Sequence, residues 1–562
     1  AETMSLMAQP RDSRLTPERA RDVCQRTGST AILNGVIAQV GKQYLLTLKA
    51  INCSSGDSLG SAESQASDKD HVLDSLGKVA SGIRSQLGES LASVQKYDAP
   101  PENVTTPSIE ALKAYSLGYQ AMVTKGDSGA AVPLFQQAIS LDPNFAMAYA
   151  RMGTCYFNLY ESVRANESTR RAYELRAHLS ERERLYIVSH YELVVTGNLV
   201  EARKVSELLA QTYPHEAPYT NLGMINSQLG DYDEALIAFE KAVKTGPIAN
   251  HYANLVDGYV LLNRLQDAMA TVREAQAKKI DSPDIHLNLY WVAFLQHDLA
   301  AMEQEAAKVL DKPGYDDQML NLLADTASYA GQLVKARSLT RRAVEVVEKE
   351  DQKETSALYL AEAAVREALV GNFDLAKKQA QTALTISNGK DVASLCAIAL
   401  GIAGDASQAK KLADGLNKRF PEDTLVQLNY LPTIRAAVSL QANDSKMAVQ
   451  SLEPAAPYEF GGNLLTLNFI FYPVYLRGEA FLAAKQGAAA ASEFQKIIDH
   501  PGAVRSEPIA ALAHLEQGRA FTLTGDNVRA KAAYDAFLSL WKDADPDVPI
   551  LKQAKEEYAR LN

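Results

Sequence analysis

Apolar residues follow two different periodicities, and the change between them lies close to residue 100. In the first part, helical spacing over 16–28 gives way to alternation over 29–40 and 42–53, rich in Ile, Val, Leu, Tyr and Thr. Alternation of this kind predicts an antiparallel hairpin, to which 57–67 adds a third strand. Helical spacing returns over 69–94. The predicted order is helix, three strands, helix, which gives a small sheet covered by helices.

This small, truncated α/β domain is predicted to span residues 1–97, with a proline-rich linker over 98–107. Beyond the linker, helical spacing recurs with a period near 34 residues. The clearest unit is "APYTNLGMINSQLGDYDEALIAFEKAVKTGP", which has the offsets of a tetratricopeptide repeat. In it Gly223 and Ala235 let two helices approach closely, and Pro247 ends the second helix.

The same register continues along the chain, with a small residue where the second helix of each unit meets the first. These residues are Ala131, Ala202, Ala235, Ala268, Ala336, Ala376, Ala409, Ala448, Ala490 and Ala530, and Met302 takes the place in one unit. The second unit is long and irregular. We therefore predict a mostly α protein: a tetratricopeptide-repeat α-solenoid, a superhelix of about 12 helix pairs over residues 108–545. A polar-faced helix over 546–562 is predicted to cap its open end.

The letters "GDSG" at 126–129 are those that surround the nucleophile of trypsin-like serine proteases. A protease nucleophile needs a histidine base, a carboxylate behind it and an oxyanion hole. Here Gly126-Asp127 falls where the turn within the first repeat belongs, as "GDY" does at 230–232. The register favours Ser128 as a turn residue, with a serine hydrolase as the remote alternative.

Other catalytic signals are absent from the sequence. It contains no phosphate-binding Gly-rich motif, no His-Glu-x-x-His, no Gly-x-Ser-x-Gly and no protein-kinase motif. The nine histidines include no pair four residues apart, and there is no Cys-x-x-Cys. We therefore predict no catalytic residues, no metal site and no cofactor.

Charge, hydrophobicity and cysteine content further limit the possible partners and location of the protein. A formal net charge of −11 argues against a nucleic-acid partner, which would require a basic face. No run of 18 apolar residues exists, and the most apolar stretch, 463–476, is predicted to be buried core.

The chain does not begin with Met, so we expect it to continue a longer protein, with any membrane span upstream. Cys24 and Cys53 form either a disulfide, in an oxidising compartment, or two buried thiols.

A stack of helix pairs creates a concave surface lined chiefly by the first helix of each pair. The register predicts that seven side chains project into it and contact a protein or peptide segment: Tyr115, Tyr119, Tyr191, Asp257, Trp291, Asn321 and Asp325. Rigid aromatic side chains would supply contact area at little entropic cost. The alternative is that these residues pack between neighbouring repeats.

Two ends of the chain also resemble a known family. Residues 16–57 resemble the later part of a TolB-type amino-terminal-like domain. Four further segments resemble the carboxy-terminal region of bacterial serine/threonine protein kinases: "TTPSIEALKAYSLG", "SERERLYI", "YLRGEAFLAAKQGAAAASEFQKIIDHPG" and "AAYDAFLSLWKDADPDVPILKQAKEEYARLN". In that family a kinase, or in some relatives a winged-helix DNA-binding domain, precedes a TolB-like domain and tetratricopeptide repeats. This chain lacks every kinase element, so the resemblance assigns no catalytic residue.

The resemblance implies a non-catalytic sensor or scaffold region of a bacterial receptor-type serine/threonine kinase, acting in signal transduction outside the membrane. The alternative is the regulatory repeat region of a winged-helix transcriptional regulator, which would place the chain in the cytoplasm. In both, the expected partner is a protein or peptide segment in the concave groove. Self-association of the array is left open.

Overall fold

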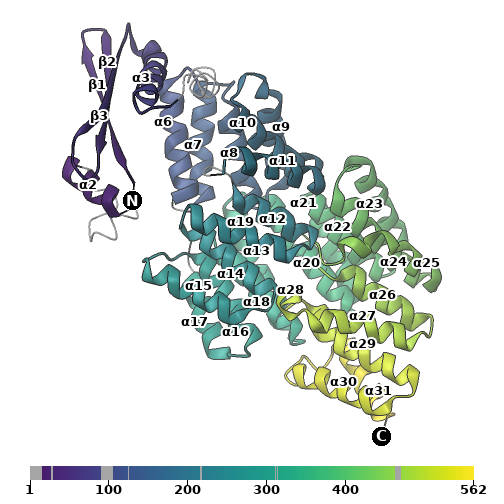
Figure 1. Ribbon diagram of the computed structural model, residues 1–562. Helices are drawn as coiled ribbons and strands as arrows, with labels where there is room; N and C mark the ends of the chain where they lie inside the picture. Colours follow the sequence, from purple (N-terminus) through teal and green to yellow (C-terminus); the bar gives the residue numbers. More distant parts are fainter. Residues whose placement is uncertain are drawn as a thin grey trace.

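The protein, studied as a computed structural model, consists of a small sheet domain followed by a long array of helices (Figure 1). The structure describes residues 16–26, 29–89, 106–124, 126–214, 218–310, 312, 314–462 and 470–561. Most of the predicted linker and the first half of the apolar stretch 463–476 lie outside these residues. The described part of that stretch, 470–476, is buried as expected.

The amino-terminal domain has one three-stranded antiparallel sheet in the order β1-β2-β3. Its elements are α2 (Pro17–Arg26), β1 (Ala31–Val40), β2 (Gln43–Asn52), β3 (Ser58–Ala66) and α3 (Val72–Gln86). Helix α3 packs on β2 and β3, where Leu46, Ala66 and Val79 form a small core. The outer strand β1 leaves apolar side chains such as Ile37 and Val40 exposed. The element order is the predicted one.

Twelve helix pairs follow within the described residues, and each helix packs against its sequence neighbours. The first four pairs are α6 (Ile109–Tyr119) with α7 (Ser128–Leu141), α8 (Ala146–Asn158) with α9 (Ser162–Glu174), α10 (Glu181–Tyr191) with α11 (Leu199–Thr212), and α12 (Tyr219–Leu229) with α13 (Tyr232–Thr245). The next four are α14 (Ala249–Leu261) with α15 (Leu265–Ala277), α16 (Pro283–Leu295) with α17 (Leu299–Val309), α18 (Asp316–Tyr329) with α19 (Leu333–Lys349), and α20 (Lys353–Leu369) with α21 (Phe373–Ile386).

The last four pairs are α22 (Lys390–Ile402) with α23 (Ala406–Arg419), α24 (Leu431–Gln441) with α25 (Ser445–Ser451), α26 (Tyr472–Ala483) with α27 (Gly487–Asp499), and α29 (Pro508–Thr524) with α30 (Asn527–Leu540). A short helix, α28 (Pro501–Val504), precedes the final pair, and α31 (Pro549–Ala559) follows it. All the small residues predicted to close the pairs are buried, and Met302 is buried in the sixth pair. In the irregular second pair, Ala165 on α9 is equally buried.

Every turn between the two helices of a pair contains one residue with a left-handed backbone. In seven pairs it is a glycine, but in five it is another residue: Tyr160, Asn263, His297, Asn443 and Lys485. Glycine adopts this conformation without steric cost, and asparagine does so more readily than most residues. The following residue is the N-cap of the second helix, for example Asp127 before α7 and Asp231 before α13. The shared turn brings the two helices of each pair side by side.

The superhelix coils tightly enough for its successive turns to touch. The loop between α8 and α9 meets the start of α20, where the Thr355 hydroxyl donates to the Leu159 carbonyl oxygen at 2.8 Å. Further along, the Tyr232 hydroxyl donates to the Phe460 carbonyl oxygen at 2.5 Å. The Trp541 indole N–H donates to the carbonyl oxygen of Tyr329 at 2.9 Å. These partners lie 196 to 228 residues apart in the sequence.

Candidate functional site

The interior of the superhelix holds a cavity of about 2200 Å³. Its wall is formed chiefly by the first helix of each of the first eight pairs, from α6 to α20, with part of α7, the last residue of α28 and residues 505–507. The successive turns of the coil therefore partly cover what would be an open groove in a flatter solenoid. We take this cavity as the candidate functional site.

The seven predicted groove residues divide into two groups. Five line the cavity: Tyr119, Asp257, Trp291, Asn321 and Asp325. Tyr115 and Tyr191 are absent from the cavity wall and pack against other rings. The ring of Tyr191 is stacked on Tyr173 with centroids 3.8 Å apart, and that of Tyr115 lies 4.9 Å from Phe145.

Asp257 and Trp291 are held by an arginine that comes from the far end of the chain. The guanidinium of Arg505 donates to Asp257 Oδ1 at 2.5 Å and lies over the Trp291 ring, 5.3 Å from its centroid. Trp291 is only 4% exposed. The sequence register placed both residues on the inner face but gave no sign of Arg505. Its contact depends on the superhelix returning upon itself.

Asn321 and Asp325, one turn apart on α18, face α20. The Asn321 amide N–H donates to Glu362 Oε2 at 2.7 Å, and Asp325 forms an ion pair with the buried Arg366. Burial raises the pKa of the Asp325 carboxyl, and the Arg366 guanidinium opposes that rise. Asn321 Oδ1 is buried and has no hydrogen-bond partner among the described residues.

An arginine that the sequence gave no reason to select lies between two tyrosines at one end of the cavity. The guanidinium of Arg151 on α8 lies over the rings of Tyr186 and Tyr119, at 4.2 and 5.1 Å from their centroids. One of its N–H groups donates to the Tyr186 hydroxyl at 2.8 Å. Its Nε is buried and has no partner among the described residues. Cation–π contacts and the hydrogen bond to Tyr186 hold the Arg151 guanidinium in place at this end of the cavity.

Ser128 lies at the start of a helix. Gly126 has the left-handed backbone of the turn, and the Asp127 carboxylate accepts from the Ala130 backbone N–H at 2.8 Å, which caps α7. The Ser128 hydroxyl accepts from the Asn158 amide N–H at 3.3 Å, and no described histidine is hydrogen-bonded to it. The turn at Gly126 and the helix cap at Asp127 account for the sequence "GDSG" at 126–129, and the arrangement does not resemble a catalytic triad.

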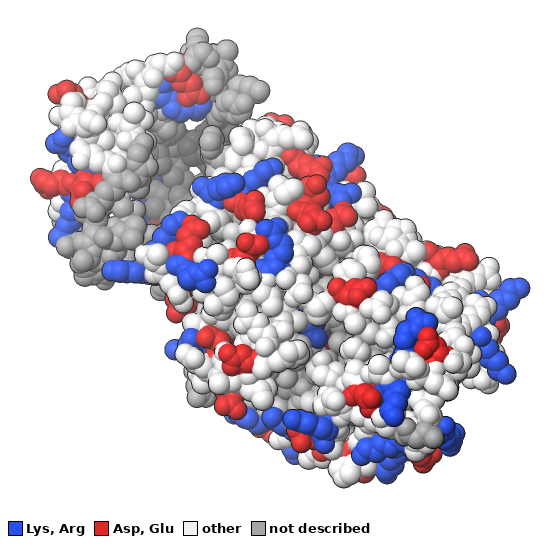
Figure 2. Space-filling view, turned by 60° about the horizontal axis from the view of Figure 1, so that its bottom comes forward, with Lys and Arg blue, Asp and Glu red and all other residues white. Residues whose placement is uncertain are grey.

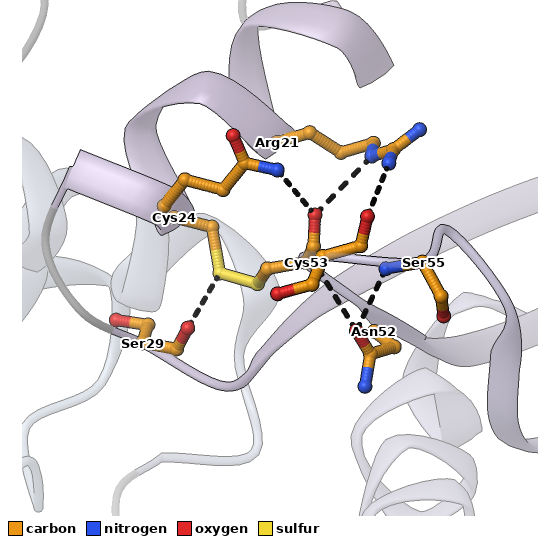
Figure 3. Close-up of a disulfide and its surroundings, with 8 residues drawn as sticks. Arg21, Cys24, Ser29, Asn52, Cys53 and Ser55 are labelled. Carbon is orange, nitrogen blue, oxygen red and sulfur yellow. Dashed lines mark hydrogen bonds between the residues drawn. A yellow bond between two sulfur atoms is a disulfide. The ribbon is translucent and has the colours of Figure 1, made fainter.

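In the amino-terminal domain Cys24 and Cys53 form a disulfide that ties α2 to the end of β2, with Cα atoms 5.9 Å apart (Figure 3). The junction is reinforced by Gln25, whose amide N–H donates to the Cys53 carbonyl oxygen at 2.9 Å, and by Arg21, which donates to the Ser54 carbonyl oxygen at 3.0 Å. Disulfides of this kind persist in oxidising compartments.

Within the described part of the chain, no group of three or more His, Cys, Asp and Glu side chains could hold a metal ion. None of the described helices is long and apolar enough to cross a membrane. On the face shown in Figure 2, Lys and Arg are interspersed with Asp and Glu, without a broad basic patch.

Comparison with known proteins supports the repeat assignment. A family model for the tetratricopeptide repeat matches residues 217–245, which correspond to α12 and α13. Residues 217–245 match the repeat itself, and the fold of the twelve helix pairs is that of a tetratricopeptide-repeat α-solenoid. Superkiller protein 3 of Schizosaccharomyces pombe is 24% identical to this chain over 227 residues, 39% of this chain but only 16% of that protein. A crystal structure of yeast Tom70 is 12% identical; the alignment covers 80% of this chain and 95% of that one, with a TM-score of 0.29, too low to support an argument.

Proposed function

We propose that this protein is a non-catalytic scaffold that holds a protein or peptide segment inside its superhelix. The observation that carries the proposal is the cavity of about 2200 Å³ along the first helices of eight consecutive repeats. Small-molecule pockets are commonly about 300–1,000 Å³, so this volume suits a polymer better than a metabolite. Tetratricopeptide solenoids use extended concave surfaces of this kind for binding.

The composition of the wall fits the same proposal. It combines amide side chains, aromatic rings, carboxylates and a few arginines, and carboxylates outnumber the basic side chains. Such a mixture offers hydrogen bonds and stacking without the basic surface that a nucleic acid would require. The excess of carboxylates on the cavity wall further favours a segment with basic side chains.

We further propose that the solenoid and its TolB-like domain form the sensor region of a bacterial receptor-type serine/threonine kinase, located outside the membrane. The Cys24–Cys53 disulfide supports an oxidising location. Reading the coding sequence upstream of this region tests the assignment. A kinase domain followed by one membrane span is expected, and a winged-helix domain would overturn it.

Binding inside the cavity is tested with a library of random peptides of about 12 residues, an extended length of about 40 Å. Peptides enriched on the immobilised full chain are labelled, and their affinity is measured by fluorescence anisotropy. Leu287 lines the cavity, so Leu287→Trp should fill part of it and weaken binding about tenfold or more, about 1.4 kcal/mol.

The matched control is Leu299→Trp, the same substitution on the outer helix α17 at a side chain that is 72% exposed. It should leave the affinity unchanged, and both variants should keep the thermal unfolding midpoint of the wild type. Failure to enrich any peptide would overturn the proposed function, as would equal affinities for both variants.

A further inference from the structure

The link between α27 and α29 reaches the inner surface of the superhelix beside α14 (Figure 1). Residues 501–507, which we call the inner strap, comprise the short helix α28 and the three residues that follow it. Gly502 lies so close to the end of α14 that a Cβ there would collide with the Val260 carbonyl oxygen. The last four residues of the strap line the cavity. The far end of the chain thus contributes to a wall that the first eight pairs otherwise form.

Arg505 of the inner strap fills a pocket that suits a guanidinium group. Its guanidinium donates to Asp257 Oδ1 and lies over the Trp291 ring, and its Nε–H donates to the Gly502 carbonyl oxygen at 3.2 Å. Only 3% of the Arg505 side chain is exposed. A carboxylate beside an aromatic face favours arginine over lysine, because the planar guanidinium can both donate to the carboxylate and stack on the ring.

The pocket remains accessible from the cavity. Asp257 and Trp291 both line the cavity, and 20% of the Asp257 side chain is exposed. Asp257 Oδ1 accepts from Arg505, whereas no hydrogen bond joins Oδ2 to any described residue. An arginine that arrives through the cavity would therefore meet the same carboxylate and the same ring.

The backbone of Arg505 adopts a conformation that is unusual for any residue other than glycine. Its φ is 55° and its ψ is −131°, outside the regions allowed to residues with a Cβ atom. Strained conformations of this kind persist only where the surrounding contacts impose them. Loss of the contacts with Asp257 and Trp291 would relieve the strain, so the backbone favours release of Arg505 from the pocket.

The downstream side of the inner strap is fixed independently of the pocket. The Ser506 and Thr326 hydroxyls are hydrogen-bonded at 3.2 Å, and the Tyr472 hydroxyl donates to Glu507 Oε2 at 3.2 Å. Arg505 can therefore leave the pocket while the start of α29 stays in place.

We propose that Arg505 is a built-in competitor: it occupies an arginine-binding pocket formed by Asp257 and Trp291, and a partner segment binds the cavity by inserting its own arginine there. The inference rests on the proposed function, since it names one side chain of the bound segment and the contact that opposes binding. The apparent affinity is lowered according to the fraction of molecules in which Arg505 has left the pocket. Binding is thereby restricted to segments that carry an arginine.

The test empties the pocket with Arg505→Gly. Glycine adopts the backbone conformation of Arg505 without steric cost, so this variant removes the guanidinium and the strain together. Peptides from the random library are enriched on immobilised Arg505→Gly, and their affinities for this variant and for the wild type are measured by fluorescence anisotropy. We expect the enriched peptides to contain arginine and to bind Arg505→Gly about tenfold or more tightly than the wild type, about 1.4 kcal/mol.

Matched changes separate the pocket from general electrostatics. Replacement of the peptide arginine by lysine should abolish the gain, as should Asp257→Asn combined with Arg505→Gly. Arg560→Gly makes the same change of side chain and charge at the exposed end of α31, and should bind as the wild type. Thermal unfolding midpoints show whether each variant folds. If Arg505→Gly does not fold, Arg505→Gln, which is neutral and can still donate to Asp257, takes its place with a smaller expected gain.

The possible results distinguish this inference from the proposed function. If arginine peptides bind the emptied pocket no more tightly than the wild type while Leu287→Trp blocks binding, Arg505 is only a contact between superhelical turns; the inference is then wrong and the proposed function stands. An equal gain for lysine peptides would assign the effect to the charge of the cavity and would also overturn the pocket. If Leu287→Trp binds normally, the proposed function fails as well.

Discussion

At the scale of single residues, the helix pairs depend on glycines that face large side chains. In four pairs a glycine in the first helix lies against an aromatic ring of the second: Gly118 with Phe135, Gly223 with Phe239, Gly478 with Phe494, and Gly518 with Tyr534. A Cβ added at Gly478 would lie 2.6 Å from Cζ of Phe494, whose side chain is fully buried. The ring cannot move outward, because the interior is closely packed.

Gly478→Ala should therefore destabilise the protein by about 1–3 kcal/mol, the usual cost of overpacking a core. Gly415 provides the control, because a Cβ there meets no atom within 4 Å. Gly415→Ala should stabilise the chain by about 0.5–1 kcal/mol, since alanine favours a helix more than glycine does. Urea-unfolding midpoints measure both changes. Equal midpoints for the two variants would contradict the role of Gly478.

At the scale of helices, the second helix of the first pair has an N-cap, Asp127, which is the aspartate of the "GDSG" sequence. Asp127 accepts from the Ala130 backbone N–H, so Asp127→Ala should cost about 1 kcal/mol of local stability in α7. Asp127→Asn should be close to neutral, because asparagine caps as well as aspartate. Hydrogen exchange at the first amides of α7 reports the difference. Unchanged exchange in Asp127→Ala would show that the cap contributes nothing.

Helix pairs could be predicted from the sequence because their signals are local. Small closing residues such as Ala235 and turn glycines such as Gly230 recur at a fixed spacing, and many matches in one register identify the pairs. The second pair was less regular, since Tyr160 replaces the turn glycine and the closing residue Ala165 stands in a polar segment. Tyr191 also lies where the local pattern is irregular, because it precedes a π-helical turn at Glu192–Thr196. The extra residue in such a turn shifts the register that placed Tyr191 in the groove.

At the scale of the whole molecule, the contacts between superhelical turns could not be predicted. They depend on the small rotation of each repeat summed over many repeats, which no local pattern records. For this reason the sequence identified Asp257 and Trp291 but not Arg505, which lies 248 residues from Asp257. The enclosed cavity is a product of the same coiling.

One of these contacts contains a buried carboxylate. Glu354, at the start of α20, is 5% exposed and accepts from the Val163 backbone N–H at 2.9 Å and from the Ser162 hydroxyl, both on α9. Burial raises the pKa of Glu354 from 4.5 to about 7, although the hydrogen bonds favour the charged form. Burial of the charged Glu354 carboxylate is therefore unfavourable, and the folded state is favoured when Glu354 holds a proton.

The pH dependence of stability follows from this shift. Between about pH 4.5 and 7 the folded protein retains a proton that the unfolded chain has released, so the contribution of Glu354 to stability falls as the pH rises. Above pH 7 burial of the charged Glu354 carboxylate lowers stability by its full amount, about 3 kcal/mol for a pKa shift of this size.

The Glu354→Gln side chain is always neutral and keeps an acceptor, so this variant should exceed the wild type in stability at pH 8 by up to that amount. The difference should shrink towards zero at pH 5, whereas Glu422→Gln, at an exposed position, should follow the wild type throughout. Urea midpoints at both pH values measure the effect, and a Glu354→Gln advantage that stayed constant with pH would show that Glu354 does not titrate in this range.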